Sequence, residues 1–263
     1  RVRVYMAIAS RLQSQAMRAL LDGDWATAKA LVAEIRTVAG HDGNFALGCQ
    51  AQSAWLHRET GRTEQEYQSS LQLVEMLPDF PVLRALLVAD AAEAGHLEIA
   101  AGLLDELAPD DFAAVGRGWL TVLALGNVAW AAIAVDARRH APVLRTLLAE
   151  FEGTMAVIAS GTHVMCSIDR LLAGLAALDG DHAEADRLFA AALAQEEGVR
   201  SAPLAARTRH WWARALVRRG DTPAALPLIA AALETAEVLG MQRLAHDLAE
   251  LAAATEGPPA QSG

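Results

Sequence analysis

A short glycine-containing turn between two amphipathic helical segments recurs along the chain and constrains the fold more than any other feature. The turn glycines are Gly23, Gly61, Gly95, Gly180 and Gly220. Their spacings are 38, 34, 85 and 40 residues. The longest interval has room for one more helix pair, whose turn would fall without a glycine at Val135–His140. Six helix pairs then cover almost the whole chain, as expected of a repeat protein.

Each turn carries residues that end one helix and begin the next. Glycine ends a helix readily because it adopts a positive φ without steric cost. Side-chain oxygens that could accept the free N–H groups of the following helix come next, at Asp24, Thr63, Asp181 and Thr222. Pro223 suits the first turn of a helix.

The packing residues repeat in register with the turns. A small residue lies five positions after the glycine, at Ala28, Ala100, Ala185 and Ala225. A larger one lies nine positions after it, at Val32, Leu104, Phe189 and Ile229. Small residues let the two helices of a pair approach closely, and the larger ones fill the gap to the next pair. The second pair departs from this pattern because Glu66 occupies the small site.

These patterns predict an all-α fold, a right-handed α-solenoid of about six antiparallel helix pairs in a degenerate tetratricopeptide-like form. The predicted pairs span residues 4–40, 44–78, 81–108, 113–151, 162–197 and 202–239, and a capping helix spans 242–255. The repeat domain is therefore predicted at 1–256, with a hinge candidate at 152–161 and a disordered tail at 257–263. A plain helical bundle is the alternative, but it would not repeat the same small-then-large pattern at each turn.

Composition limits the classes of partner. The formal net charge is −10, whereas a nucleic-acid-binding domain needs a basic face, so we expect no direct nucleic-acid binding by this segment. Residues 118–135 form an uncharged stretch of 18 residues, at the lower limit for a membrane span. We interpret it as the buried centre of a helical protein, and we expect a cytoplasmic protein with no membrane partner. Cys49 and Cys166 form no CxxC motif, so no disulfide framework is indicated.

Catalytic motifs are missing from the sequence. It contains no HExxH, GxSxG or GxGxxG pattern, and its single lysine, Lys29, is not part of a phosphate-binding loop. His163, Cys166 and Asp169 could share a helix face and hold a soft metal, but no fourth ligand accompanies them. A buried structural cysteine with a capping histidine is the favoured alternative. We therefore expect no catalytic residue, no cofactor and no metal, and a protein that is not an enzyme.

The concave face of the predicted stack is the candidate binding site. In such stacks the first helix of each pair lines the groove, and counting back from the turn glycines selects Trp55, Arg58, Arg170, Arg207, His210 and Arg214. A basic strip of this kind would bind an anionic partner through bidentate arginine contacts. The alternative is that these arginines pair with acidic residues of adjacent helices.

The stretch 161–240 also carries a family resemblance. GTHVMCSIDRLLAGLAALDGDHAEADRLFAAALAQEE, followed by ARTRHWWARALVRRGDTPAALPLIAAALETAEVLGM, resembles the C-terminal helical region of large bacterial regulatory ATPases. These are LuxR-type transcriptional regulators and related adenylate or guanylate cyclase proteins. The resemblance implies a helical scaffold that senses or relays signals, and it transfers no catalytic residue. Because the chain starts at Arg1 within a helical pattern, we expect it to be a piece of a longer protein.

Two functions follow as expectations. As an interaction module, the groove would bind a protein or peptide, including another domain of the same parent chain, and relay a signal. As an effector sensor, it would hold a small anionic molecule. A closed polar pocket near Trp55, Arg170 or His210 would favour the sensor, and an open shallow groove would favour the interaction module.

Overall fold

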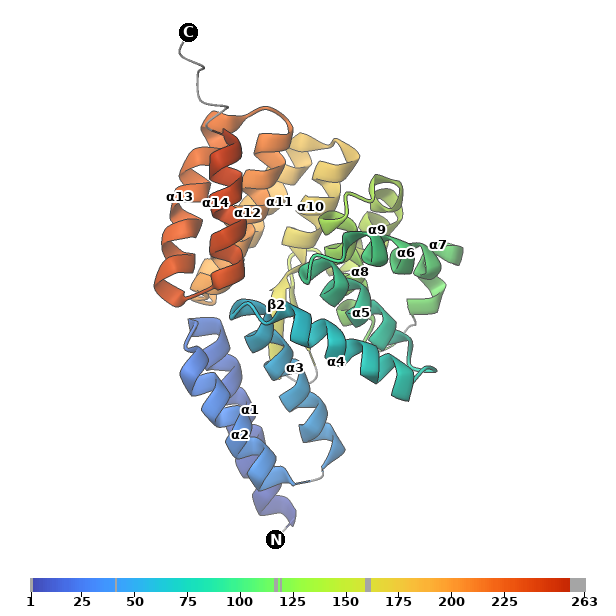
Figure 1. Ribbon diagram of the computed structural model, residues 1–263, viewed down its shortest axis with the longest axis vertical. Helices are drawn as coiled ribbons and strands as arrows, with labels where there is room; N and C mark the ends of the chain where they lie inside the picture. Colours follow the sequence, from blue (N-terminus) through green and yellow to red (C-terminus); the bar gives the residue numbers. More distant parts are fainter. Residues whose placement is uncertain (1, 41, 116–117, 119, 159–161, 256–263) are drawn as a thin grey trace.

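The computed structural model describes residues 2–40, 42–115, 118, 120–158 and 162–255, and this part of the chain is almost entirely helical (Figure 1). The predicted all-α helical-repeat class is confirmed, whereas the handedness of the stack stays a prediction. Six helix pairs follow one another: α1 (Val2–Asp22) with α2 (Trp25–Ala39), α3 (Gly43–Glu59) with α4 (Thr63–Met76), α5 (Pro81–Glu93) with α6 (Leu97–Leu107), α8 (Thr121–Ala134) with α9 (Ala141–Leu148), α10 (Ile168–Asp179) with α11 (His182–Gly198), and α12 (Ala202–Arg218) with α13 (Thr222–Leu239).

Shorter elements complete the chain. A single helix, α14 (Gln242–Thr255), follows the sixth pair at the predicted capping position. The short α7 (Pro109–Phe112) and three 3-10 turns, η1 (Ala113–Val115), η2 (Arg138–His140) and η3 (Ala149–Phe151), connect the central pairs. The fourth pair was predicted to begin at residue 113, but its first helix begins only at Thr121.

The turns have the backbone geometry that the glycines predicted. All five turn glycines have φ between +76° and +88°. In the glycine-free fourth turn, Asp136 takes the left-handed conformation with φ of +57°. Aspartates supply the caps, since Asp24, Asp181 and Asp221 each accept a hydrogen bond from a backbone N–H of the following helix. The capping roles predicted for Thr63 and Thr222 are wrong, because each is the first residue inside its helix.

The repeated packing positions form the core. The small residues after the turns, such as Ala28 and Ala225, and the larger ones, such as Phe189 and Ile229, are all buried. Glu66, at the small site of the second pair, is buried as well, and its carboxylate lies 2.8 Å from Nδ1 of His57. The exception to the pattern is therefore accommodated by a local hydrogen bond between Glu66 and His57 rather than by a change of fold.

One segment departs from helix. Strand β1 (Met155–Ile158) pairs in antiparallel fashion with strand β2 (His163–Ser167), with Met155 opposite Ser167. The predicted helical start of pair five at Thr162 is therefore wrong. The run rich in valine, isoleucine and methionine suits a strand, and α10 begins only after Ser167, whose hydroxyl caps it.

The metal-site hypothesis assumed that His163, Cys166 and Asp169 lie on one helix, and the hairpin contradicts that assumption. His163 and Cys166 lie on strand β2, whereas Asp169 lies in the first turn of α10, so the three side chains do not share one helix face. Among the described residues, no group of three or more His, Cys, Asp or Glu side chains is close enough together to hold a metal ion.

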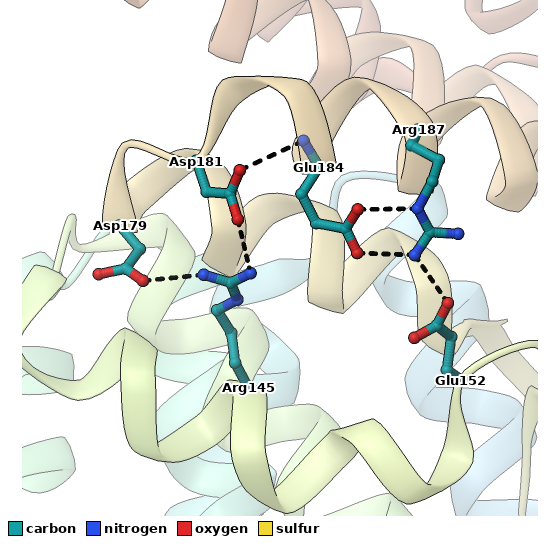
Figure 2. Close-up of polar contacts among 6 residues, drawn as sticks. All are labelled: Arg145, Glu152, Asp179, Asp181, Glu184 and Arg187. Carbon is teal, nitrogen blue, oxygen red and sulfur yellow. Dashed lines mark hydrogen bonds and ion pairs between the residues drawn. The ribbon is translucent and has the colours of Figure 1, made fainter.

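Ion pairs connect α9 and the segment before the hairpin to the α10–α11 turn and to α11 (Figure 2). Arg145 of α9 contacts Asp179 at 2.8 Å and Asp181 at 3.0 Å. Arg187 of α11 contacts Glu184 and Glu152. Glu152 is the first residue of the predicted hinge, so an ion pair with Arg187 connects the start of that segment to α11. Hinge motion itself stays a prediction, and residues 159–161 and the predicted tail at 257–263 lie outside the described residues.

The uncharged stretch of the sequence is the centre of the molecule. Within α8, residues 124–133 are all buried, which confirms the interpretation of this stretch as a core helix. In the described part of the chain, α13 alone is long and apolar enough to cross a membrane by length and composition. It packs on α12 and α14 through residues that include Ala225 and Ile229.

The stack curls until its first and last pairs touch (Figure 1). The indole Nε1 of Trp25, at the first turn, donates to the carbonyl of Leu239 at 2.6 Å. Arg18 donates to the carbonyl oxygens of Val199 and Arg200, each at 3.0 Å. The turn after α3 also approaches α14. The concave face is therefore enclosed rather than open.

Candidate functional site

The enclosed interior is organised around Trp130, at the centre of α8. Three of the predicted groove arginines surround its indole ring. The guanidinium carbons of Arg58, Arg170 and Arg207 lie 4.9, 5.2 and 5.5 Å from the ring centroid. These arginines come from pairs two, five and six, so the fold brings together residues that are far apart in the sequence. Each contact is within the range of a cation–π interaction.

These three arginines are paired with carboxylates inside the protein. Arg58 lies 3.2 Å from Asp90, and Arg170 lies 3.8 Å from Glu196. Arg207 lies 2.7 Å from Glu59 and 3.9 Å from Glu93. All three side chains are buried, so they stabilise the interior and do not form a free basic strip.

The pKa values in the interior reflect burial and pairing. Burial raises the pKa of Asp90 and of Glu196, and the neighbouring arginines offset part of that effect. Burial alone would also raise the pKa of Glu93, but Arg207 and Arg58 hold it below its ordinary value. Glu93 therefore stays ionised beside the centre of the stack.

Trp55 packs on a histidine from the hairpin. Its ring centroid lies 4.5 Å from that of His163. Burial, assisted by the Arg58 cation, lowers the pKa of His163 to about 3. Within the described structure, neither ring nitrogen of His163 has a hydrogen-bond partner. The imidazole is thus neutral at physiological pH and acts as a packing group.

A cavity of about 390 Å³ lies beside this filled centre, between α5, α8, α12 and α14. That volume falls within the range of sites for small molecules. Its lining residues are Ala92, Glu93, Leu97, Trp130, Ala134, Arg207, His210, Trp211, Arg214, Arg243, Asp247, Glu250 and Leu251. Trp55, Arg58 and Arg170 are not part of this lining, so the structure places only three of the six predicted groove residues at the cavity.

One face of α12 supplies the polar wall of the cavity. Arg207, His210, Trp211 and Arg214 lie at positions i, i+3, i+4 and i+7 and therefore share a helix face. Facing them, α14 contributes Arg243, Asp247, Glu250 and Leu251 at i, i+4, i+7 and i+8. The sequence prediction treated α14 only as a cap. Its own helical spacing of polar residues is the signal that could have indicated a second wall.

Two groups in the lining lack partners. Among the described residues, Arg214 makes no ion pair or hydrogen bond, and the same holds for His210, which is 6% exposed. The other lining arginines are paired, Arg207 with Glu59 and Arg243 with Asp247 at 3.0 Å. The cavity therefore holds one cation without a counter-charge.

The pKa shifts of His210 and Arg214 are those expected for groups that are buried close to other cations. Burial and the charge of Arg214 lower the pKa of His210 well below its ordinary value, so the imidazole is neutral. Burial and Arg218 lower the pKa of Arg214 itself. An anion placed beside these two groups would relieve both effects, because it would favour the charged form of each.

No family model, curated protein or solved structure matches the chain significantly. The resemblance to regulatory ATPases therefore stays a prediction, carried by the residues quoted above.

Proposed function

We propose that the chain is a non-catalytic helical-repeat module that senses a small anionic effector in the cavity between α5, α8, α12 and α14. The observation that carries the proposal is Arg214, which has no carboxylate at ion-pairing distance among the described residues, beside the unpartnered His210. A half-buried guanidinium without a counter-charge is costly, and an anion that pairs with it gains a charge-assisted hydrogen bond.

The enclosed interior favours an effector over a peptide in the groove. The concave face is filled by Trp130 and by arginines paired with carboxylates, so it offers no continuous groove for an extended chain. Beside it lies a cavity of about 390 Å³ near His210. A cavity of this size, bordered by exposed residues such as Leu97, can hold a small molecule.

The same cavity could relay a signal. Its walls come from the third, fourth and sixth helix pairs and from α14. An occupant would contact elements that lie far apart in the sequence, and it would favour the arrangement in which these walls fit it best. In keeping with the resemblance of residues 161–240 to regulatory ATPases, we propose that such a module belongs to a larger bacterial signalling protein.

Interaction with a protein, including another domain of a parent chain, is the second candidate function. It is favoured by an apolar patch at the turn after α4, where Met76, Leu77 and Phe80 are 67%, 52% and 43% exposed. Exposed apolar patches are typical of contact surfaces. In this view a partner protein would bind the patch, and its binding would depend on whether the cavity is occupied.

A titration with a panel of small anions tests the sensor. The panel contains monocarboxylates, dicarboxylates, phosphate esters and sulfonates, and binding is followed by calorimetry with the full chain. We expect at least one class to bind the native protein and to lose affinity in Arg214→Leu. Arg209→Leu is the matched control, since Arg209 lies on the same helix, pairs with Glu197 and is not part of the lining. Equal behaviour of the two variants, or no binding by any anion, would contradict the proposal.

A further inference from the structure

The charges around the cavity limit how many negative charges an occupant can carry. The lining contains three arginines and three carboxylates, the latter being Glu93, Asp247 and Glu250. Arg207 and Arg243 are already paired, which leaves Arg214 as the cation without a counter-charge among the described lining residues. Glu93 and Asp247, together with Asp136, also act on Arg214 at longer range. A second negative charge on the occupant would meet carboxylates instead of a free cation.

The polar end of the cavity fits a planar anion. A guanidinium presents parallel N–H donors that match the two oxygens of a carboxylate. His210 lies one helical turn before Arg214 on α12, and a neutral imidazole has one N–H to donate. Together the two side chains can donate to both oxygens of a single carboxylate.

Six of the lining residues are apolar and provide a surface for the body of an occupant. Trp130 and Trp211 lie with ring centroids 4.8 Å apart in an edge-on arrangement, and both contribute to the lining. Ala92, Leu97, Ala134 and Leu251 complete this apolar part. Trp130 and Trp211 are 1% and 7% exposed, so most of the apolar surface open to an occupant belongs to Leu97, Ala134 and Leu251, and covering such surface gains free energy.

We infer that the effector is a monocarboxylate with an apolar body, the carboxylate paired with Arg214 beside His210. The body of the molecule packs against Leu97, Ala134 and Leu251, next to Trp211. This inference rests on the proposed function and narrows it, because it selects one class of anion by charge and shape. A phosphate ester, a dicarboxylate or a cation does not satisfy this lining.

A matched set of ligands tests this selection. Phenylacetate, benzylphosphonate, phenylacetamide and benzylamine share a benzyl body and differ in charge and head group. Binding of each to the full chain is measured by calorimetry and by the fluorescence of the tryptophans. We expect phenylacetate to bind about tenfold or more tightly than the neutral amide, the difference expected for hydrogen bonds to a charged group. The preference should disappear in Arg214→Leu and persist in Arg209→Leu.

The outcomes separate this inference from the proposed function. If benzylphosphonate binds more tightly than phenylacetate and depends on Arg214, the monocarboxylate inference is wrong, whereas the anion sensor stands. If benzylamine binds best, the acidic side chains dominate the cavity and both proposals fail. If phenylacetate binds no better than phenylacetamide, the inference fails, and the wider anion panel decides on the sensor. Circular dichroism of both variants confirms that each retains the helical fold.

Discussion

Arg207 and Arg214 lie two helical turns apart on one face of α12, and their surroundings give them different roles. Arg207 points into the filled centre, where it pairs with Glu59 and contacts the Trp130 ring. Arg214 lines the cavity, and no carboxylate in the described structure is within ion-pairing distance. The position of a residue in the repeat therefore predicts on which face of the helix it lies. Whether its charge is structural or available to a ligand depends on whether a carboxylate of the protein is paired with it.

The largest expected effect concerns stability at these two positions. Arg207→Met leaves the Glu59 carboxylate buried without its partner, and such losses cost about 3–5 kcal/mol. Arg214→Met removes a half-buried cation that has no paired carboxylate, so it should not destabilise the protein by more than about 0.5 kcal/mol and should tend to stabilise it. Urea unfolding at pH 7 measures both. The double variant Arg207→Met/Glu59→Gln should recover part of the loss, and similar costs for the two single variants would contradict the comparison.

The next effect is a dependence of stability on pH that arises in the filled centre. The pKa of His163 is about 3 in the folded protein, below its ordinary value of 6.5, because of burial and the Arg58 cation. Below pH 6.5 the unfolded chain binds a proton that the folded chain does not, so the contribution of this group to stability falls as the pH falls toward 3. The slope is about 1.4 kcal/mol per pH unit.

A histidine replacement isolates this contribution. His163→Phe keeps an aromatic ring against Trp55 and removes the titrating group. Relative to the native protein, the variant should gain about 2 kcal/mol of stability between pH 6.5 and pH 5. Urea unfolding at both pH values tests this, and a constant difference between the two proteins would show that the pKa of His163 is the same in the folded and unfolded states.

The filled centre and the cavity wall should also differ in how tightly they are packed. Substitutions that test this difference should change the free energy of unfolding less than the loss of the Arg207 ion pair does. A methyl group at Gly174 would lie 2.6 Å from Cδ1 of Ile133, so Gly174→Ala should cost about 1–3 kcal/mol despite the better helix propensity of alanine. Ala134→Val, on the cavity wall, should change stability by less than about 0.5 kcal/mol and should weaken phenylacetate binding. Thermal unfolding and calorimetry measure these effects. Equal destabilisation by both substitutions would mean that the cavity wall is as tightly packed as the centre.

The smallest effect is expected on the outer surface, at the junction in Figure 2. Arg145 pairs with Asp179 and Asp181, but all three side chains are partly exposed. Arg145→Ala should therefore cost only about 0.2–1 kcal/mol, and the cost should decrease in high salt. Urea unfolding at low and high ionic strength measures it. A cost as large as that of Arg207→Met would contradict the distinction between buried and exposed pairs.

The sequence predicted the local architecture well because each turn carries its own chemistry. Left-handed glycines mark five turns, and the interval alone located the sixth, where Asp136 takes the glycine's role. The hairpin was missed because a short apolar run such as His163–Ser167 is compatible with a buried helix as well as a strand.

Of the cavity lining, the sequence predicted only residues of α12. Counting from the turns found Arg207, His210 and Arg214, since these lie on one face of one helix. Glu93, Trp130 and the residues of α14 come together only because the stack curls until its ends meet. A repeat pattern specifies how each pair contacts the next, but it does not specify the curvature that encloses the interior.

The availability of Arg214, in contrast to Arg207, can be measured directly by nuclear magnetic resonance of the arginine side-chain Nε–H groups. Assignments follow from the signals that vanish in Arg214→Leu and in Arg207→Met. Addition of phenylacetate should shift the Arg214 signal in a saturable way and leave that of Arg207 nearly unchanged. A shift at Arg207 with none at Arg214, or equal shifts at both, would contradict the division of this helix face into a structural and a ligand-binding arginine.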